Sequence, residues 1–448
     1  MDEPRTLLEL LASRGTYIYA PCGGGGRCGK CAVTVGTPAR RVLACQTPAD
    51  DFSDAIVLRE PAEPPVLESA DEYSEICAID LGTTTVSASF RGRRVVTANP
   101  QRVFGADVVS RIAQAEAQPL RRLAVSAIER LTSAFGARTA VVCGNTVMTS
   151  ILLGRDTSGL SQSPFTYDPA LREAFVLTGA ESGLPFDRVI IPPCPAPYVG
   201  SDAYIGDWGL ALRVPPDTVS LYADMGTNCE LLLRTPRGLY AASAPAGPAF
   251  EGGNISCGAP YVAGAVDRVS YNRFTGFAAR TVGNAPPIGV CGAGATSIIS
   301  VLLENGFLGR DGAPRSALWD DGRVEIAPRV YFTFKDAESL LLARAAVRTG
   351  IDALLVAAGS PEVSVFRVAG GFAEKSALPA MFDVGLFPPE FKKIAVPCGN
   401  AALSGARLFA EYFAKNRRFP SLRAVTEVPL AGSEFFAERF MARMNFAG

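Results

Sequence analysis

The sequence predicts an α/β protein with a small cysteine-rich N-terminal domain and a larger, duplicated two-lobed domain. Three observations lead to this fold class. Four of the eleven cysteines lie in the first 45 residues, and a stretch rich in proline and glutamate follows at 60–75. Beyond it, strands and helices alternate, and the motif D-[LM]-G-T-[TN] occurs twice. Two strand–turn–strand units of one type indicate a duplicated lobe.

Composition excludes several classes of protein. The chain has 448 residues, of which 48% are hydrophobic and 19% charged, so it can bury large cores. The chain has a formal net charge of −1, so it lacks the excess of basic residues that is typical of a nucleic-acid-binding protein. No apolar run approaches the ~18 residues of a membrane-spanning helix, and the N-terminal MDEPRTLLEL is unlike a signal peptide. We therefore expect a cytoplasmic protein that binds neither nucleic acid nor membranes.

The chain contains no histidine, which removes histidine general bases, Ser-His-Asp triads and histidine metal sites. Its cysteines are odd in number and follow no export signal, so disulfides are disfavoured. The cysteines should therefore be metal ligands or buried thiols.

The N-terminal cysteines have the spacing of an iron–sulfur site. Cys22, Cys28 and Cys31 share one glycine-rich loop, and Cys45 follows in LACQ. Plant-type [2Fe–2S] sites use a C-x4-C-x2-C run with a distant fourth cysteine, whereas the first gap here is five residues. Glycines accept positive φ and expose amide groups toward the sulfurs. A structural zinc site and a metal-free segment remain alternatives, although zinc sites usually pair two short cysteine hooks.

This segment resembles the [2Fe–2S] ferredoxin domains that are fused to larger proteins. The resemblance implies a β-grasp domain over 1–59. Because the chain begins almost directly with the predicted helix TLLELLASRG, we expect a trimmed version of that fold. The following linker, 60–75, contains three prolines and should be fairly stiff.

Two turns after apolar strands have the chemistry of phosphate binding. In Asp80–Thr84 and Asp224–Asn228, a glycine lets the backbone approach phosphate oxygens, and amide and hydroxyl groups donate to them. An aspartate at the strand end can hold Mg²⁺ through water or orient the attacking water. A third element, Phe366–Glu374, is a strand that ends in Gly370-Gly371, on which an adenine ring could lie. Its alternative is an ordinary strand-to-helix turn.

Together these motifs resemble the acetate/sugar kinase–Hsp70–actin superfamily. Asp80–Thr84 and Asp224–Asn228 match its two phosphate motifs, and Val368–Gly371 matches its adenosine motif. The sequences CGNT from Cys143 and CGNAA from Cys398 match the two connecting motifs.

The resemblance implies an ATPase with lobe I over 76–212, lobe II over 213–400 and a closing segment over 401–448. It implies catalytic roles for Asp80 and Asp224. The implied ATP-binding residues are Gly82, Thr83, Thr84, Asn145, Gly226, Thr227, Asn228, Gly370, Gly371 and Asn400.

Longer stretches are similar to one branch of that superfamily, the ATP-dependent reductive activators of corrinoid proteins. These stretches are GNTVM at 144–148, YVGSDAYIG at 198–206, SAPAGPAFEGGNISCG at 243–258, PIGVCGAGA at 287–295 and VGLFPPEF at 384–391. Such activators also carry an N-terminal [2Fe–2S] domain. The resemblance implies three cofactors, the [2Fe–2S] cluster, ATP and Mg²⁺. It also implies a corrinoid protein as electron acceptor and an unknown low-potential electron donor.

A one-electron cluster joined to an ATPase suggests that ATP hydrolysis assists a difficult reduction. Plant-type clusters have potentials near −400 mV. The family resemblance implies that the Co(II)/Co(I) step of the acceptor is harder, and each 100 mV costs about 2.3 kcal/mol per electron. The predicted function is an ATP-dependent reductase that returns an inactive Co(II) corrinoid protein to Co(I). The alternatives are an electron donor to another low-potential Fe–S acceptor and a nucleotide- or redox-sensing binding protein.

The other seven cysteines are expected to be core thiols. Cys291, in a glycine-rich turn, is the one with a possible metal role, since some superfamily reductases bridge a cluster across a homodimer with such cysteines. Glu251, in GPAFEGG, is either a residue that contacts the acceptor or positions water, or part of a surface turn.

Overall fold

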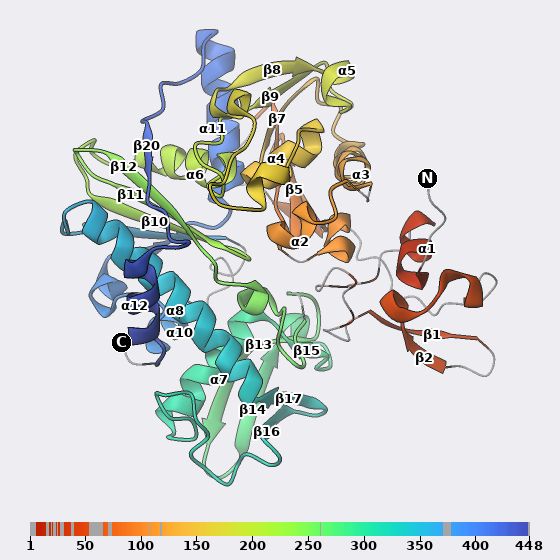
Figure 1. The fold of residues 1–448 in the computed structure, drawn as a ribbon, viewed down its shortest axis with the longest axis vertical. Coiled ribbons are helices and arrows are strands. Elements are labelled where there is room, and N and C mark those ends of the chain that lie inside the picture. Colours follow the sequence, from red (N-terminus) through yellow and green to blue (C-terminus); the bar gives the residue numbers. More distant parts are fainter. Residues whose placement is uncertain are drawn as a thin grey trace. The chain divides into compact units, whose positions relative to one another are not determined.

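The structure is a computed structural model (Figure 1). It describes residues 6–14, 18, 20, 24, 26, 31–36, 40–52, 66–69, 74–105, 107–116, 119–259, 261–370 and 378–446. The chain forms two compact units. Unit 1 comprises Met1–Gly206 and Ala402–Ser421, and unit 2 comprises Asp207–Ala401 and Leu422–Gly448.

The division between the units differs in two ways from the expected lobe limits. It falls at Gly206/Asp207, inside helix α6 (Ser201–Ala211), rather than at 212/213. The expected closing segment is shared: residues 402–421 join unit 1 and residues 422–448 join unit 2.

The N-terminal segment has a small apolar core. It contains α1 (Leu7–Ser13), the antiparallel strands β1 (Ala32–Val35) and β2 (Arg40–Leu43), and the short helices η1 (Ala44–Gln46) and η2 (Ala49–Phe52). Leu7, Leu8 and Leu11 of α1 pack with Val33 and Val35 of β1. The helix confirms the one expected at the start of the chain, and its leucine spacing explains its buried face.

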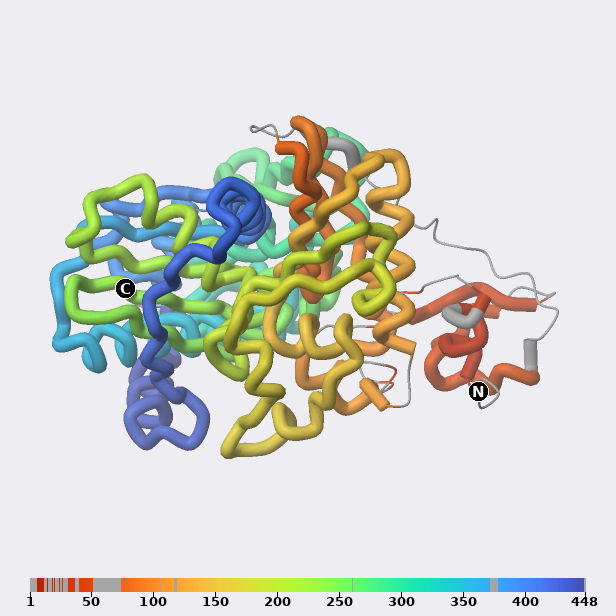
Figure 2. The backbone as a smooth tube through the Cα atoms, turned by 90° about the horizontal axis from the view of Figure 1, so that it is seen from above, coloured from red at the N-terminus to blue at the C-terminus, as the bar shows by residue number. Residues whose placement is uncertain are grey.

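Unit 1 is built on a seven-stranded sheet in the order β3-β6-β5-β4-β7-β9-β8. Its strands are β3 (Val66–Ser69), β4 (Cys77–Leu81), β5 (Thr85–Phe90), β6 (Arg93–Ala98), β7 (Thr139–Cys143), β8 (Phe175–Thr178) and β9 (Arg188–Ile191). Figure 2 shows the course of the backbone as a tube, seen from above. Strands β4, β7 and β9 are parallel, and β4, β5 and β6 form an antiparallel meander. Strand β3 lies inside the expected linker, since residues 66–69 pair with β6.

Helices of unit 1 cover and connect its sheet. They are α2 (Val108–Ile112), α3 (Leu120–Thr132), α4 (Thr146–Leu153), α5 (Gly179–Ser182), the start of α6, and most of α11 (Ala401–Asn416), with η3 (Pro100–Phe104), η4 (Ser158–Leu160) and η5 (Pro169–Arg172) in the loops. Ala124, Ala127 and Ile128 of α3 share one buried cluster with Ile79 and Leu81 of β4. This packing fixes the strand that carries Asp80.

Unit 2 repeats the central strand order of unit 1. Its main sheet runs β19-β18-β10-β11-β12-β20, with β10 (Ser220–Met225), β11 (Cys229–Arg234), β12 (Leu239–Ala244), β18 (Val365–Ala369), β19 (Ala395–Pro397) and β20 (Val425–Glu427). Strands β10, β18 and β19 are parallel, and β10, β11 and β12 form the antiparallel meander. The order β12-β11-β10-β18-β19 therefore matches β6-β5-β4-β7-β9, which confirms the predicted duplication.

The rest of unit 2 extends this sheet. It comprises a second sheet of β13 (Ala265–Asn272), β14 (Gly276–Thr281) and β15 (Gly289–Val290), the hairpin β16 (Arg323–Ala327) and β17 (Val330–Thr333), and the helices η6 (Pro248–Glu251), η7 (Val282–Asn284), α7 (Gly292–Glu304), α8 (Phe334–Ala357), α10 (Leu378–Asp383), η8 (Pro389–Lys393) and α12 (Glu434–Ala442). None of the helices in the described ranges is long and apolar enough to span a membrane.

Two helices of unit 2 begin at side-chain caps. Helix α8 begins at a capping box in which Thr333 and Asp336 bond each other's backbone amides. Its buried face, with Val347 and Ile351, packs in the cluster that contains β10 and β11. Helix α12 begins after the Ser433 cap, whose hydroxyl accepts from the amide of Phe436.

Candidate functional site

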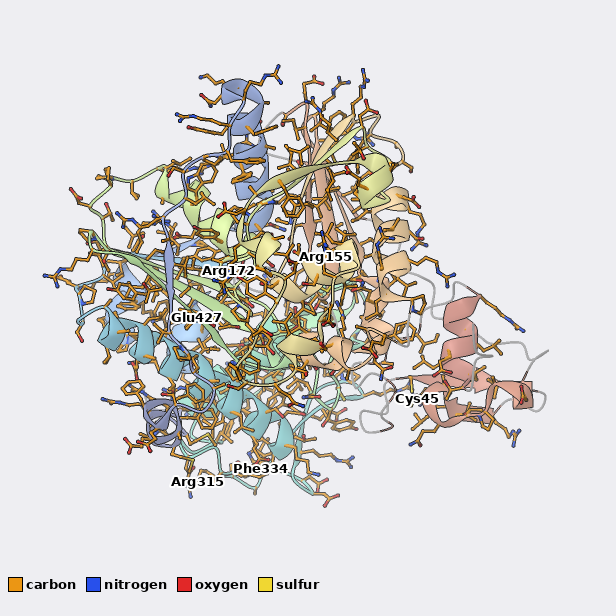
Figure 3. All side chains as sticks on the ribbon, turned by 45° about the horizontal axis from the view of Figure 1, so that its top comes forward. Cys45, Arg155, Arg172, Arg315, Phe334 and Glu427 are labelled. Atoms are coloured by element: carbon orange, nitrogen blue, oxygen red, sulfur yellow. The ribbon has the colours of Figure 1, made fainter. Side chains whose placement is uncertain are left out.

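Two of the four predicted cluster ligands are brought together in the N-terminal segment. The Sγ atoms of Cys31 and Cys45 lie 3.3 Å apart, and the residues are 1% and 8% exposed. Figure 3 labels Cys45 in this segment. The amide of Ala44 donates to the carbonyl of Cys31 at 3.0 Å, which holds the two cysteines in register. Cys22 and Cys28 lie outside the described residues.

Gly24 and Gly26, two described residues of the glycine-rich sequence, lie against the Cys45 segment. Gly24 and Gly26 have φ of +84° and +71°, as expected for glycines that curve a loop around a cluster. A Cβ on Gly24 would lie 3.8 Å from the Cβ of Cys45, and one on Gly26 would lie 2.0 Å from the Gln46 side chain. Gly24 therefore lies next to Cys45, and Gly26 lies next to Gln46.

The Cys31–Cys45 geometry fits a shared metal. A disulfide would need sulfurs about 2.05 Å apart. Two thiolates bound to one tetrahedral metal at about 2.3 Å would lie roughly 3.7 Å apart, close to the observed separation. Among the described residues, no group of three or more potential metal ligands occurs, so the loop cysteines are needed to complete a four-thiolate set.

In unit 1, the predicted phosphate turn lies at the carboxyl edge of the sheet. Asp80 is half-buried in β4, and its Cα is paired with that of Cys143 at the end of β7. The turn at 82–84 follows β4, while Gly144 and Asn145 follow β7. Because the two strands are parallel, both segments emerge at the same edge.

Asn145 links these two segments directly. Its Nδ2 lies 3.5 Å from the hydroxyl of Thr83, while its Oδ1 accepts from the amide of Met148 and caps α4. A Cβ on Gly200 would lie 2.1 Å from the Cα of Asn145. Only glycine therefore allows the chain just before α6 to approach Asn145 this closely.

Two buried residues that the sequence analysis did not single out hold the turn at 82–84. Asn99 donates from Nδ2 to the carbonyl of Gly82 at 2.8 Å, and its own amide donates to the carbonyl of Thr84. The guanidinium of Arg111 donates to the carbonyl of Thr83. Both residues are fully buried, so the turn is held from the protein side through its carbonyl groups. The available sequence signal for Asn99 was its position before a proline.

In unit 2, the second phosphate turn has a different set of neighbours. The hydroxyl of Tyr222 donates to Asp224 at 2.8 Å. Burial raises the pKa of the Asp224 carboxyl, and this hydrogen bond opposes the rise. The hydroxyl of Thr227 donates to the carboxylate of Glu251 at 2.5 Å. Glu251 therefore lies beside the predicted phosphate turn and is not part of a remote surface loop.

The predicted adenosine motif also reaches this edge of unit 2. The Cα of Asp224 is paired with that of Ala369 at the end of β18. Gly370 has φ of +96°, and a Cβ there would lie 2.3 Å from the carbonyl oxygen of Met225, so the approach requires glycine. Its amide donates to the carbonyl of Gly399, next to Asn400. Gly371 lies outside the described residues.

Five of the seven remaining cysteines are buried and two are half-buried. The Cys291 thiol donates to the carbonyl of Val266 at 3.3 Å, and burial raises the pKa of this thiol. A raised pKa disfavours the thiolate that a metal needs. The geometry of Cys291 is thus that of a core thiol.

With this geometry described, comparison with known proteins identifies the family. The C-terminal domain of RACo, the ASKHA domain, matches residues 218–448, which is more than half of the chain. The chain belongs to the RACo family. The RACo middle region matches residues 76–208, and a 2Fe-2S iron-sulfur cluster binding domain matches residues 1–50. These matches confirm the predicted fold class and the [2Fe–2S] cluster and ATP as cofactors; Mg²⁺ is typical of the ASKHA domain.

Two characterised relatives of this RACo family member carry names that describe corrinoid chemistry. The corrinoid activation enzyme RamQ of Eubacterium limosum is 24% identical over 579 aligned residues, which cover 98% of this chain and 95% of RamQ. The Co(II) methylated amine-specific corrinoid protein reductase of Methanosarcina barkeri is 25% identical over 299 residues. That alignment covers 59% of this chain and 54% of the reductase.

A solved structure supports the fold. The structure of a reductive activator for corrinoid, iron-sulfur protein has a TM-score of 0.70 and 23% identity, covering 99% of this chain and 96% of the other. Its similarity extends over both the N-terminal segment and the two units.

The cluster ligands lead to the first prediction. Anaerobically purified protein should contain about two irons and two acid-labile sulfides per chain, and Cys45→Ser should lose both, because a [2Fe–2S] cluster needs four protein ligands. The control is Cys257→Ser, a half-buried thiol of unit 2, which should retain the cluster. Zinc without acid-labile sulfide in the wild-type protein would contradict the assignment.

The hydrogen bond from Asn99 to the carbonyl of Gly82 leads to the second prediction. Asn99→Asp keeps the oxygen that accepts from Gln101 but removes the donor to the Gly82 carbonyl. Losing about 1 kcal/mol of loop support should weaken binding of a fluorescent ATP analogue by about fivefold. The control is Asn305→Asp, whose side chain bonds only its own helix α7. Equal affinity in Asn99→Asp and wild type would show that the turn does not depend on this bond.

Proposed function

We propose that this chain is an ATP-hydrolysing iron–sulfur reductase that delivers a low-potential electron from its [2Fe–2S] cluster to a Co(II) corrinoid protein and returns that protein to Co(I). The observation that carries the proposal is the joining, in one RACo family chain, of a cluster-binding segment with two phosphate turns at equivalent strand ends. Phosphoryl transfer alone requires no electrons, so the cluster distinguishes this chain from a kinase. An unidentified low-potential donor protein recharges the cluster.

The residues of the two turns have complementary roles in this proposal. In unit 1, the amides and hydroxyls of Thr83 and Thr84 donate to phosphate oxygens. In unit 2, the backbone amides of the turn after Asp224 do the same, while the hydroxyl of Thr227 donates its one proton to the carboxylate of Glu251. Bound Mg²⁺ would neutralise charge on the phosphates, and in this proposal Asp80 and Asp224 would hold it through water or orient the hydrolytic water.

In the proposed coupling, ATP acts on the binding of the corrinoid protein partner. ATP can shift a conformational equilibrium only by its different affinity for the two states. The phosphate turns and the cluster ligands lie in segments far apart in the sequence, and none of the bonds described above joins them. We therefore infer that ATP changes the affinity for the corrinoid protein and leaves the electronic surroundings of the cluster as they are.

The direct test uses a Co(II) corrinoid protein as acceptor. With the chain, a strong reductant and ATP, the optical spectrum should change from Co(II) to Co(I), and omission of ATP should slow this change at least about tenfold. The acceptor should also stimulate ATP hydrolysis. Stimulation without any reduction of cobalt would favour a nucleotide-sensing protein and contradict the reductase.

The carboxylate of Asp224 supplies a more specific prediction. Asp224→Asn is nearly isosteric but removes the charge, so it should retain nucleotide binding and lose most of the ATPase activity, about 100-fold or more. Asp217→Asn, at an exposed position just before β10, is the matched control and should be unaffected. ATP hydrolysis at the wild-type rate in Asp224→Asn would show that Asp224 has no catalytic role and only forms part of the turn.

The coupling model predicts an unchanged cluster potential. Potentiometric titration should give the same midpoint with and without ATP, while the affinity for the Co(II) corrinoid protein changes. A shift of more than ~60 mV, which is about tenfold in equilibrium for one electron, would show that ATP alters the donor itself.

A further inference from the structure

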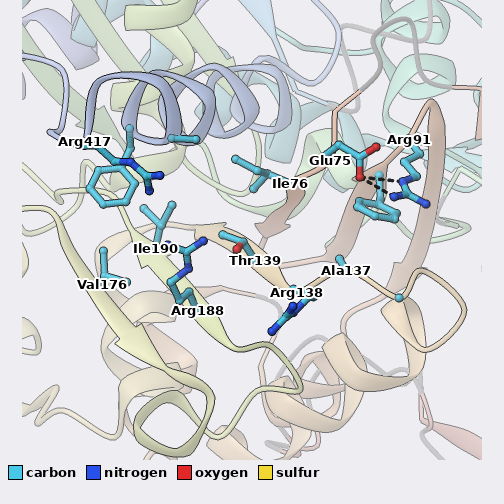
Figure 4. A pocket seen from close by; sticks show the side chains of 14 residues that line it. Glu75, Ile76, Arg91, Ala137, Arg138, Thr139, Val176, Arg188, Ile190 and Arg417 are labelled. Carbon is cyan, nitrogen blue, oxygen red and sulfur yellow. Dashed lines mark hydrogen bonds and ion pairs between the residues drawn. The ribbon is translucent and has the colours of Figure 1, made fainter.

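A cavity of about 360 Å³ lies at the opposite edge of the unit 1 sheet from the phosphate turn (Figure 4). Ile76 comes just before β4, Thr139 is the first residue of β7, and Arg188 is the first residue of β9; all three line the cavity. Because these strands are parallel, their starts share the amino edge of the sheet. All the lining residues belong to unit 1.

The floor of this cavity is apolar. Phe90 and Ile190 are buried, and Ile190 is the paired neighbour of Val176 across β8 and β9. Phe413 and Ala414, near the end of α11, close one side. The volume is within the range of roughly 300–1,000 Å³ that is usual for small-molecule pockets with mostly apolar walls.

The rim of the cavity is cationic. Arg91 pairs with Glu75 at 2.6 Å, and Arg138 pairs with Asp187 at 2.6 Å. Arg188 and Arg417 also line the cavity, and neither has an ion-pair or hydrogen-bond partner for its side chain among the described residues. Figure 4 shows these two side chains on the same side of the pocket.

We propose that this cavity binds a small organic phosphate, with a ring-sized apolar body on the floor and the phosphate held by Arg188 and Arg417. A phosphate monoester carries a charge of about −1.5 to −2 at neutral pH, which matches two uncompensated guanidinium groups. Guanidinium groups bind phosphate oxygens through paired hydrogen bonds. Neither the apolar floor nor the arginines alone would select this class of ligand.

The site is separate from the proposed nucleotide-binding turns. Strand β4 has five residues, so its two ends are about 15 Å apart at roughly 3.3 Å per residue. A ligand at Ile76 therefore does not reach the turn that follows Leu81. The proposal is independent of the reductase function, and the ligand is expected to bind without displacing ATP.

The experiment is calorimetric titration of the full chain with phenyl phosphate. We expect saturable binding of one molecule per chain, both with and without a saturating non-hydrolysable ATP analogue. Inorganic phosphate, which lacks the apolar body, and benzyl alcohol, which lacks the charge, should each bind at least about tenfold more weakly.

Two variants locate the binding. The double variant Arg188→Gln/Arg417→Gln and the single variant Val176→Glu, which places a carboxylate at the floor, should each weaken binding at least about tenfold. Arg130→Gln removes an exposed arginine of α3 outside the cavity and should bind as wild type does. Circular dichroism spectra and ATPase activity should be unchanged in all three variants.

Three results would overturn the proposal. One is the absence of saturable binding of phenyl phosphate. Another is equal affinity in the double variant and in Arg130→Gln. The third is binding of a glutamate-rich peptide at this site without binding of phenyl phosphate, which would make the cavity part of a protein-docking surface.

Discussion

The parallel pairing of β4 with β7, and of β10 with β18, is the constraint on which the two phosphate turns depend. In each unit, an aspartate at the end of one strand is paired with the last residue of its parallel neighbour, Asp80 with Cys143 and Asp224 with Ala369. The chain leaves both strands at the same edge of the sheet. A glycine-containing turn and a second polar segment therefore meet at that edge. Open α/β sheets place ligands at such carboxyl ends for this reason.

The two turns share a sequence pattern but are stabilised by different means. The turn of unit 1 is held by carbonyl bonds to Asn99 and Arg111, both fully buried. In unit 2, two acidic side chains accept hydrogen bonds at the turn, Asp224 from Tyr222 and Glu251 from Thr227, beside the backbone bond from Gly226 to Asn228. Hydrogen bonds to the carbonyls of a turn fix the position of its backbone. Hydrogen bonds to a carboxylate instead affect the charge and the orientation of that side chain. The duplication therefore supplies two predicted phosphate turns of one sequence pattern with different hydrogen-bond partners.

The sequence was sufficient where the signal is local. The paired turns, the first helix α1 and the Cys31–Cys45 proximity all follow from motifs and spacing within short stretches. It was insufficient where the structure depends on distant partners. Arg111 is an ordinary helical arginine until tertiary packing places it beneath Thr83, and residues 66–69 read as linker because only pairing with β6 makes them a strand. The unit division at Gly206/Asp207 could not be read either, because α6 has no break there.

Joining the cluster and the ATPase in one chain has an energetic consequence that does not require contact between them. An electron leaves the cluster with whatever driving force the cluster potential allows, and ATP cannot increase it without changing the surroundings of the sulfurs. What ATP can change is the relative stability of conformations that bind the acceptor differently, by an amount limited to its own differential affinity. A deficit of 100 mV requires about 2.3 kcal/mol, which is a modest share of the binding free energy of a protein partner with micromolar affinity, about 8 kcal/mol. In the proposed coupling, an uphill reduction is therefore driven through the binding and release of the corrinoid protein, and the cluster potential stays constant through the cycle.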